Sequence, residues 1–356
     1  MVFRPPTVRE SDGWRVDDSL AERVLVLDSL HALIALYFAR PQSAERAAFA
    51  LENRCGVPFD IIVAGIEWLF ADGVIVERIG PPVPEWTMHV NKTRSLWWSY
   101  GWINACEYHL ATYDSRFIPV TKEGRLESDE LMKSYANNEV DQDRTKIVST
   151  TEKLRLPDVE PSLIAINYGQ KPNYLSQLRL QELSSVLSVV FGPVRKTQPS
   201  WNGAPLIFRT SPSGGARHPT EGYLISRNIE GLSPGLYHIS IDPPTLAYVK
   251  AIEDLPDCYV TMLERSEFSI AAVIILTTVF ERNMYRYRES RTYRTVHMDA
   301  GHICGSLEIL LKHVGLRTFV QYGPDDQYLQ DLIGSHPLEE GVQISIGIGT
   351  ARRSDV

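Results

Sequence analysis

The fold is decided by the stretch Ser211-Pro212-Ser213-Gly214-Gly215-Ala216-Arg217-His218-Pro219-Thr220-Glu221-Gly222-Tyr223-Leu224. Its Ser-Pro step does not suit a helix, and its paired glycines allow the backbone to take positive φ and to approach a flat or bulky group closely. The residues that follow, 222–226, have the composition of a strand. A turn that leads directly into a strand is commonly only a structural element, so its function must be argued from its surroundings.

Strand and helix patterns on both sides of this turn predict an α+β domain. The run 269–280 is continuous and rich in β-branched residues, which is typical of a central strand buried on both faces. The other elements have helical spacing or period-two alternation, and two of the strands form a hairpin. We expect helices at 179–191 and 299–314, and strands at 222–226, 235–241, 245–249, 269–280 and 342–348. Long helices combined with a hairpin-containing sheet are typical of the α+β class.

The first 85 residues predict a small domain that resembles a winged helix. The expected elements are helices at 20–39, 43–53 and 60–71, the last capped by Asp60, and a short strand at 73–77. A stiff Gly-Pro-Pro-Val-Pro run at 80–84 marks the end of this domain, residues 1–85. Its third helix has no lysine or arginine, so it lacks the phosphate contacts of a DNA-recognition helix. We expect the domain to dock a peptide or to pack against its neighbour.

Residues 86–155 are expected to connect this domain to the catalytic one. They include the aromatic-rich stretch 96–102, which we expect to pack at a seam between domains. The part from 120 to 160 is polar and charged, and we interpret it as mobile surface or linker. The catalytic domain is then expected to occupy residues 156–356.

Composition narrows the possible functions. The chain has 356 residues and a net charge of −8, which argues against a general nucleic-acid binder with a basic surface. Its four cysteines form no Cys-x-x-Cys pair, so we expect neither a metal site nor disulfides, and a reducing cytoplasm fits best. The longest apolar run, Ile270–Phe280, is too short to span a membrane, and the first residues have no apolar signal core.

A segment rich in arginine and tyrosine comes directly after the expected central strand. This Arg/Tyr segment, residues 282–294, reads Arg-Asn-Met-Tyr-Arg-Tyr-Arg-Glu-Ser-Arg-Thr-Tyr-Arg. A run of charges is often a solvated face. However, functional side chains are commonly displayed where a strand ends, and clustered arginines suit the binding of phosphate or carboxylate. The segment therefore predicts a functional site beside the end of the central strand.

The residues of these stretches resemble the sequence motifs of one known family. Residues 212–223 are similar to the Pro-Ser-(Ala/Gly)-Gly-Ala-Arg-x-Pro-x-Glu-x-Tyr signature of SagB-type dehydrogenases, which are FMN-dependent azoline oxidases of the nitroreductase superfamily. The Arg/Tyr segment resembles the family's Arg-x-x-x-Lys-Tyr-x-x-Arg-x-Tyr-Arg motif, and residues 299–302 match its Asp-Ala-Gly-His. The resemblance covers about residues 96–118 and 200–350. It implies a nitroreductase-like fold, a mostly antiparallel sheet flanked by helices, and a homodimer.

The resemblance also implies which residues form the site. The flavin is expected to lie against the turn formed by Ser213, Gly214, Gly215, Ala216, Arg217 and His218. Tyr287 is the expected proton acceptor, and Arg286 is its electrostatic partner or a substrate clamp. Arg286 stands where the family has lysine, and because an arginine stays protonated it cannot be the general base.

A second departure concerns the phosphate of FMN. Superfamily members usually carry an Arg-Arg-Ser-x-Arg stretch at the start of the domain, whereas residues 161–171 contain no arginine. Arg352 and Arg353, or Lys171, are the residues expected to compensate.

These observations favour an FMN-dependent dehydrogenase that oxidises an azoline to an azole, or a related bond, in a modified peptide. A cyclodehydratase or another biosynthetic protein is the expected partner. An NAD(P)H-dependent reductase of nitro or quinone compounds on the same fold is the first alternative. The second is a degenerate, flavin-poor scaffold subunit of a peptide-modifying complex, which would explain the two departures from the family's motifs.

Overall fold

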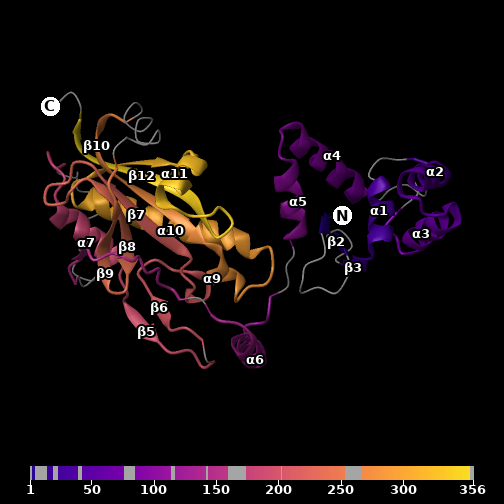
Figure 1. Cartoon of the computed structure of the whole chain (residues 1–356), viewed down its shortest axis with the longest axis horizontal. Coiled ribbons are helices and arrows are strands. Elements are labelled where there is room, and N and C mark those ends of the chain that lie inside the picture. Colours follow the sequence, from indigo (N-terminus) through magenta and orange to yellow (C-terminus); the bar gives the residue numbers. More distant parts are fainter. Residues whose placement is uncertain are drawn as a thin grey trace. The chain divides into compact units, whose positions relative to one another are not determined.

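The computed structural model describes residues 2–4, 14–18, 23–38, 42–75, 85–113, 117–141, 143–158, 174–201, 203–252 and 266–352. The chain groups into two compact units, Met1–Phe117 and Ile118–Val356 (Figure 1). Each unit has a hydrophobic core of its own. The division at 117 falls between the boundaries expected at 85 and 155, and those two boundaries stay predictions.

The first unit begins with strands rather than with a long helix. The helix expected at 20–39 is wrong over residues 23–27, which form strand β3 (Arg23–Leu27), and its residues 20–22 and 39 lie outside the described residues. The last side chains of this strand alternate between half-buried, exposed and buried, as in a strand with one face on a core. Helix α1 (Ser29–Tyr37) starts after Asp28, whose carboxylate accepts a hydrogen bond from the His31 amide at 2.8 Å.

The next two helices agree closely with their sequence signals. Helix α2 (Ala44–Cys55) is capped by Ser43 and ends at Gly56, which takes the left-handed conformation. Helix α3 (Phe59–Ala71) begins one residue earlier than expected, so the predicted cap Asp60 lies in its first turn. Buried side chains from all three helices form the core of this unit.

The rest of the first unit is a small sheet and two further helices. Its strands pair antiparallel in the order β1-β2-β3. The remaining elements are β1 (Val2–Arg4), β2 (Trp14–Asp18), α4 (Glu85–Ser99) and α5 (Ile103–Ala111). Residues 73–75 form a turn and a bend rather than the expected strand, and the rest of that strand lies outside the described residues. The seam expected at 96–102 and the winged-helix likeness stay predictions.

The second unit opens with a helix where the sequence suggested a mobile linker. Helix α6 (Lys122–Asn138) is capped by Thr121, whose hydroxyl accepts a hydrogen bond from the Gly124 amide at 3.1 Å. Its apolar face is narrow, and its buried Met132 packs with distant side chains of the same unit, including Trp201. The linker interpretation of this stretch is therefore wrong.

The central sheet has seven strands, and every neighbouring pair is antiparallel. Its order is β11-β12-β10-β7-β8-β9-β4. The strands are β4 (Lys153–Arg155), β7 (Thr220–Ser226), β8 (Gly235–Ile241), β9 (Pro244–Lys250), β10 (Phe268–Val279), β11 (Arg317–Gln321) and β12 (Glu340–Arg352). A separate two-stranded sheet contains β5 (Arg195–Thr197) and β6 (Leu206–Phe208).

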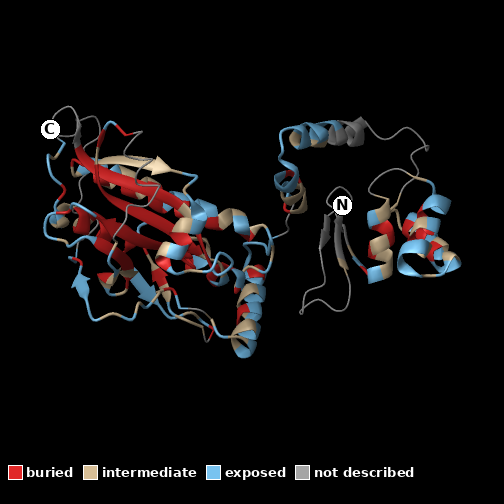
Figure 2. Ribbon diagram, turned by 45° about the horizontal axis from the view of Figure 1, so that its top comes forward, coloured by how far each residue is buried: buried red, intermediate tan, exposed pale blue. Residues whose placement is uncertain are grey.

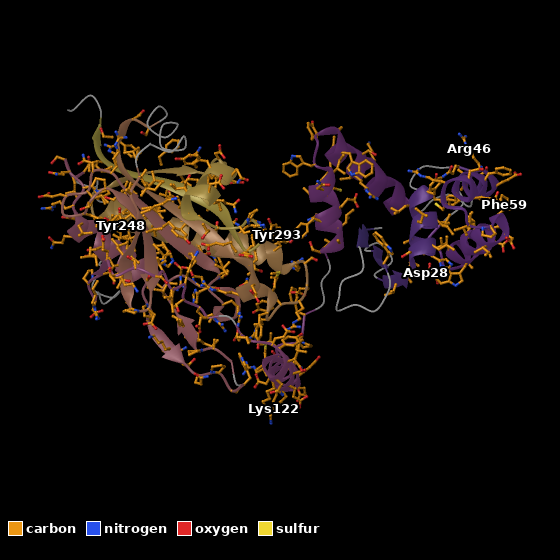
Figure 3. All side chains as sticks on the ribbon, in the orientation of Figure 1. Asp28, Arg46, Phe59, Lys122, Tyr248 and Tyr293 are labelled. Atoms are coloured by element: carbon orange, nitrogen blue, oxygen red, sulfur yellow. The ribbon has the colours of Figure 1, made fainter. Side chains whose placement is uncertain are left out.

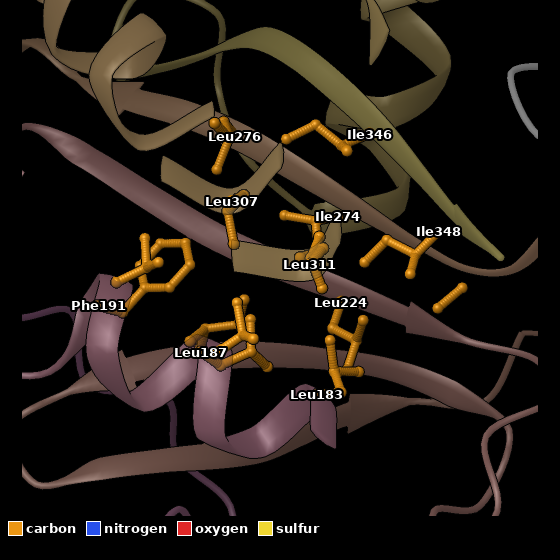
Figure 4. Close-up of a cluster of buried hydrophobic side chains, with 14 of the residues drawn as sticks. Leu183, Leu187, Phe191, Leu224, Ile274, Leu276, Leu307, Leu311, Ile346 and Ile348 are labelled. Carbon is orange, nitrogen blue, oxygen red and sulfur yellow. The ribbon is translucent and has the colours of Figure 1, made fainter. Parts of the chain in front are cut away.

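Helices cover both faces of the central sheet, which confirms the predicted α+β class. Helices α7 (Leu180–Phe191) and α10 (Thr292–His313) bury one core against it (Figure 4). Helix α11 (Asp326–Ile333) contributes to a second core with β7 and β10. The middle strands are the most deeply buried part of the unit (Figure 2), and β10 is buried on both faces as expected. None of the helices in the described ranges is long and apolar enough to cross a membrane.

The strand pairing also determines where the functional segments lie. Strand β7 runs antiparallel to β10, and Thr220 at its start pairs with Thr278 near the end of β10. The turn that precedes β7 is therefore next to the short helix α9 (Phe280–Met284) and the Arg/Tyr segment that follow β10. A main-chain hydrogen bond of 2.8 Å from Val279 to Pro219 joins the two ends.

Candidate active site

The signature turn, defined here as Ser213–His218, leads from β6 towards β7 and has an unusual backbone. Gly214–Ala216 form one 3₁₀ turn, with Gly215 at a φ of 61°. Ala216 and His218 also have positive φ, at 51° and 46°. Residues other than glycine rarely take this conformation, and it persists only where the surrounding structure enforces it, as it commonly does in functional sites.

Two serines fix this turn to helix α10. The Ser213 hydroxyl donates to Asp299 Oδ2 at 2.6 Å and accepts from the His218 amide at 2.9 Å. The hydroxyls of Ser211 and Ser306 lie 3.2 Å apart. Burial raises the pKa of Asp299 above its ordinary value. Asp299, which the sequence offered only as part of a motif, is therefore an anchor of the turn.

The structure places the signature turn against the predicted catalytic pair. A Cβ atom added to Gly215 would lie 2.5 Å from Tyr287 Oη and 3.0 Å from Arg286 Cδ. Both side chains are half-buried, and the Arg286 guanidinium carbon lies 5.7 Å from the ring centroid of Trp201. Among the residues that the structure describes, no carboxylate forms an ion pair with Arg286. The two stretches that the sequence singled out separately therefore lie against each other.

Arg217 is fully buried beneath this turn. Its Nη2 donates to Asp141 Oδ1 at 2.7 Å, and its Nε donates to the carbonyl of Arg282. Its guanidinium carbon also lies 5.1 Å from the ring centroid of Tyr285. Burial lowers the pKa of Arg217, and the hydrogen bond to Asp141 opposes that shift. These contacts are internal to the protein, and a direct role of Arg217 in holding a cofactor stays a prediction.

A buried charge network lies next to the turn. Glu221 pairs with Arg282 at 2.5 Å and with His238 Nε2 at 2.8 Å. Burial alone would raise the pKa of Glu221, but the charge of Arg282 and the hydrogen bond from His238 lower it to about 2. Burial lowers the pKa of Arg209 to about 10, with Glu221 opposing the shift, and its nitrogens have no hydrogen-bond partner within the described ranges.

His218 is buried in the same network and should make stability depend on pH. Burial, together with the positive charge of Arg209, lowers its pKa to about 3. The unfolded chain, with an ordinary histidine pKa of about 6.5, therefore binds a proton in this range that the folded chain does not. Stability should fall as the pH drops from about 6.5 towards 3, by up to about 1.4 kcal/mol per pH unit for this one group.

Urea unfolding of the full chain at pH 7, 6 and 5 measures this effect. His218→Asn, whose side chain tolerates positive φ, should show a shallower loss of stability with falling pH than the parent protein. His297→Asn, at an exposed position, is the matched control and should follow the parent. Equal slopes for the parent and His218→Asn would contradict the assignment of a buried neutral imidazole.

Two other residues of the Arg/Tyr segment, Arg288 and Tyr293, lie at the margin of the candidate site. Arg288 forms a two-pronged pair with Glu139, with both contacts at 2.9 Å. Tyr293 is exposed near the start of α10, where Figure 3 labels it. Of the predicted phosphate ligands, Arg352 ends strand β12, but its side chain lies outside the described part, as do Arg353 and the whole stretch 161–171.

The sequence interpretation missed several buried residues of this site. Asp141 and Arg144 lie in the stretch that was expected to be linker, and no periodic pattern marks them. Glu221 and Tyr223 stand inside the quoted signature, so the motif itself was the signal that could have identified them. Arg209, four residues before Ser213, has no sequence signal beyond its place between a strand and the turn.

Comparison with known proteins identifies the domain that holds this site. Residues 176–350 match the Nitroreductase family. This part of the chain is a nitroreductase-family domain. Membership of the superfamily, predicted from the signature turn and the Arg/Tyr segment, is therefore confirmed, and so is the nitroreductase fold with its antiparallel sheet flanked by helices.

Individual relatives of this chain include one from peptide maturation. The trifolitoxin-processing protein TfxB of Rhizobium leguminosarum bv. trifolii is 23% identical over 310 residues, which cover 82% of this chain and 80% of the relative. That similarity is in keeping with a SagB-type member of the superfamily.

Two solved structures are also similar to parts of this chain. A nitroreductase-like protein from Anabaena variabilis is 24% identical with a TM-score of 0.44, and the match spans 63% of this chain but only 45% of that one. The Escherichia coli microcin synthetase McbBCD complex, with truncated pro-MccB17 bound, is 18% identical with a TM-score of 0.41, covering 67% of this chain and 85% of the matched one.

The residues around the turn suit the ring of a flavin, the cofactor that the fold family implies. Gly215 is exposed and has no side chain, so a flat group can approach its backbone. Beside it lies the guanidinium of Arg286, which has no ion-pair partner in the described ranges and is a donor suited to a ring carbonyl oxygen. The side chains expected to hold the phosphate lie outside the described part of the chain.

Proposed function

We propose that this chain is an FMN-dependent dehydrogenase that oxidises a modified peptide, converting an azoline to an azole or desaturating a related C–N or C–C bond. The observation that carries the proposal is the close approach of Gly215 to Arg286 and Tyr287. The family resemblance implies that the flavin lies against the turn and that the pair handles the proton. The proposal is supported by the contact between the turn and the pair. FMN, when bound, supplies the hydride acceptor for this chemistry.

The protein's own groups have distinct tasks in such a reaction. Oxidation of an azoline removes one hydride and one proton from adjacent ring atoms. Tyr287 is the proposed proton acceptor, because its hydroxyl lies at the exposed backbone of Gly215. A guanidinium is a poor proton acceptor, so the proposed role of Arg286 is to hold an anionic group of the substrate or to act as the electrostatic partner of Tyr287. Ser213 and Asp299 hold the turn in place.

A peptide substrate is supported by the similarity to the trifolitoxin-processing protein. We extend the proposal to a homodimer and to a biosynthetic partner such as a cyclodehydratase. A domain that docks a peptide, as expected for the N-terminal region, would serve a peptide substrate better than a small molecule.

The visible spectrum of the purified full chain is the direct test. Absorbance bands at about 370 and 450 nm would show an oxidised flavin. Incubation with an azoline-containing peptide should then remove two hydrogen atoms per ring, which mass spectrometry detects. Rapid bleaching by NADPH with turnover of a small quinone, but not of the peptide, would instead identify a small-molecule reductase. A colourless protein that gains no colour on addition of FMN would identify a scaffold subunit.

A further inference from the structure

A segment outside the matched nitroreductase region reaches into the candidate site. This tether, residues 139–146, follows helix α6, and all of it except residue 142 is described. Four of its charged side chains, at 139, 141, 144 and 146, form ion pairs. Three of these connections lead to the nitroreductase-family domain, at Arg288, Arg217 and Glu340. The site is therefore built partly from residues that precede the family's matched region.

Asp141 is the centre of the tether. Its carboxylate accepts hydrogen bonds from Arg217 at 2.7 Å and from Arg144 at 2.9 Å, and both guanidinium groups are fully buried. The same carboxylate also accepts the Ala204 amide at 3.2 Å. Burial alone would raise the pKa of Asp141, but hydrogen bonds from the two arginines lower it. One ionised carboxylate therefore holds two buried cations.

The two arginines differ in what they hold. Arg217 belongs to the signature turn and also donates to the carbonyl of Arg282, so it ties the turn to the Arg/Tyr segment. Arg144 belongs to the tether itself. The neighbouring carbonyl of Asp143 accepts from Arg282 Nε at 2.9 Å, which adds a second tie to the same segment. Within the described residues, Asp141 is connected to the turn that carries Gly215 through Arg217.

We propose that Asp141 is a positioning residue, which fixes Arg217 and through it the signature turn against the Arg/Tyr segment. Removing one member of a buried ion pair leaves the other charge uncompensated. The residue that bears this charge is then held less firmly, and so are the segments that it contacts. For Asp141 this includes the backbone of the turn. The proposal rests on the proposed function only for its second readout, FMN affinity.

The first readout is hydrogen exchange of the full chain, which needs no cofactor. Asp141→Asn should speed exchange in a peptide covering 211–219 by about tenfold or more, while a peptide from strand β10 changes little. Arg144→Met is the matched control: it removes a buried cation from the same carboxylate but keeps the Asp141–Arg217 arm. That variant should leave exchange in the turn near the parent rate.

Titration of the apoprotein with FMN is the second readout. Asp141→Asn should weaken binding about tenfold or more, because the turn that approaches the ring is no longer held. If Asp141→Asn does not fold, Arg217→Lys is the variant to measure. Lysine keeps a buried positive charge for Asp141 but lacks the planar guanidinium that also donates to the Arg282 carbonyl. Faster exchange in the turn of that variant supports the proposal.

Two results would overturn this inference. One is parent-like exchange in the turn of Asp141→Asn, or of Arg217→Lys where the first variant cannot be made. The other is an equal acceleration in Asp141→Asn and Arg144→Met, which would mean that the carboxylate serves only global stability. Absence of FMN binding by the parent protein would instead contradict the proposed function. The hydrogen-exchange data would still decide the role of Asp141.

Discussion

Tyr287→Phe is expected to keep the fold and the flavin but to lose about 10²- to 10⁴-fold of the oxidation rate, the usual contribution of a general base. The substitution removes only the hydroxyl, which lies against Gly215 at the exposed surface of the turn. Single-turnover oxidation of an azoline peptide, followed by the visible spectrum, measures the loss. Tyr293→Phe, an exposed tyrosine of the same segment, is the matched control and should turn over at the parent rate.

Arg286→Lys separates two roles for the neighbouring arginine. If position 286 serves proton transfer, lysine restores the residue that the family carries there, and activity should be retained or should rise. If Arg286 binds an anionic group of the substrate through two parallel N–H donors, lysine should raise KM strongly while the flavin stays bound. Parent-rate turnover by Tyr287→Phe would remove the tyrosine from the mechanism whatever Arg286→Lys does.

Caps, closing glycines and apolar faces were enough to predict the bounds of the helices and strands that carry these signals in their own sequence. Helix α2 has its serine cap and its closing glycine, and α7 and β10 carry continuous apolar faces, so each was predicted close to its observed bounds. Helix α10 begins at Thr292 rather than 299, because the polar residues of its first turns hide the helical periodicity. Where periodicity was applied across the β3–α1 boundary, it merged a strand and a helix into one element.

Elements that depend on distant partners could not be predicted in this way. Helix α6 has few apolar residues, and Met132 is buried only because it packs with Trp201 and Tyr285, which lie far away in the sequence. The role of Asp141 depends likewise on Arg217, which is 76 positions further along the chain. Nothing local distinguishes such a carboxylate from one in a solvated linker. Its identification required the pairing that the fold creates.

The candidate site lies between these two cases. The motifs identified the signature turn and the Arg/Tyr segment separately, but no local pattern showed that they touch. Their contact follows from the antiparallel pairing of β7 with β10, which places the start of one strand beside the end of the other. Because the sequence does not state which strands are neighbours, the resemblance was the only route to a joint site.

Gly215→Val is expected to abolish retention of FMN in a protein that stays soluble. The backbone of Gly215 has a φ of 61°, which β-branched residues avoid, and even the first side-chain atom would lie 2.5 Å from Tyr287 Oη. Tyr287 or the turn must then move, so the surface offered to a flat ring changes. Gly214→Ala should be much milder, because its Cβ would meet only Thr295 Cγ2 at 3.1 Å.

The effect of strain can be separated from the effect of contact by comparing two alanine variants. Gly334 has a φ of 70°, close to that of Gly215, but a Cβ there would have no atom of the described residues within 4 Å. Both Gly215→Ala and Gly334→Ala should cost about 1 kcal/mol of stability through left-handed strain. Only Gly215→Ala should also weaken FMN binding, because its Cβ would force Tyr287 or the turn to move. The expected loss of affinity is about tenfold or more, which corresponds to about 1.4 kcal/mol for each factor of ten. Equal FMN affinity in these two variants, measured by fluorescence titration of the apoproteins, would show that the turn does not contact the cofactor.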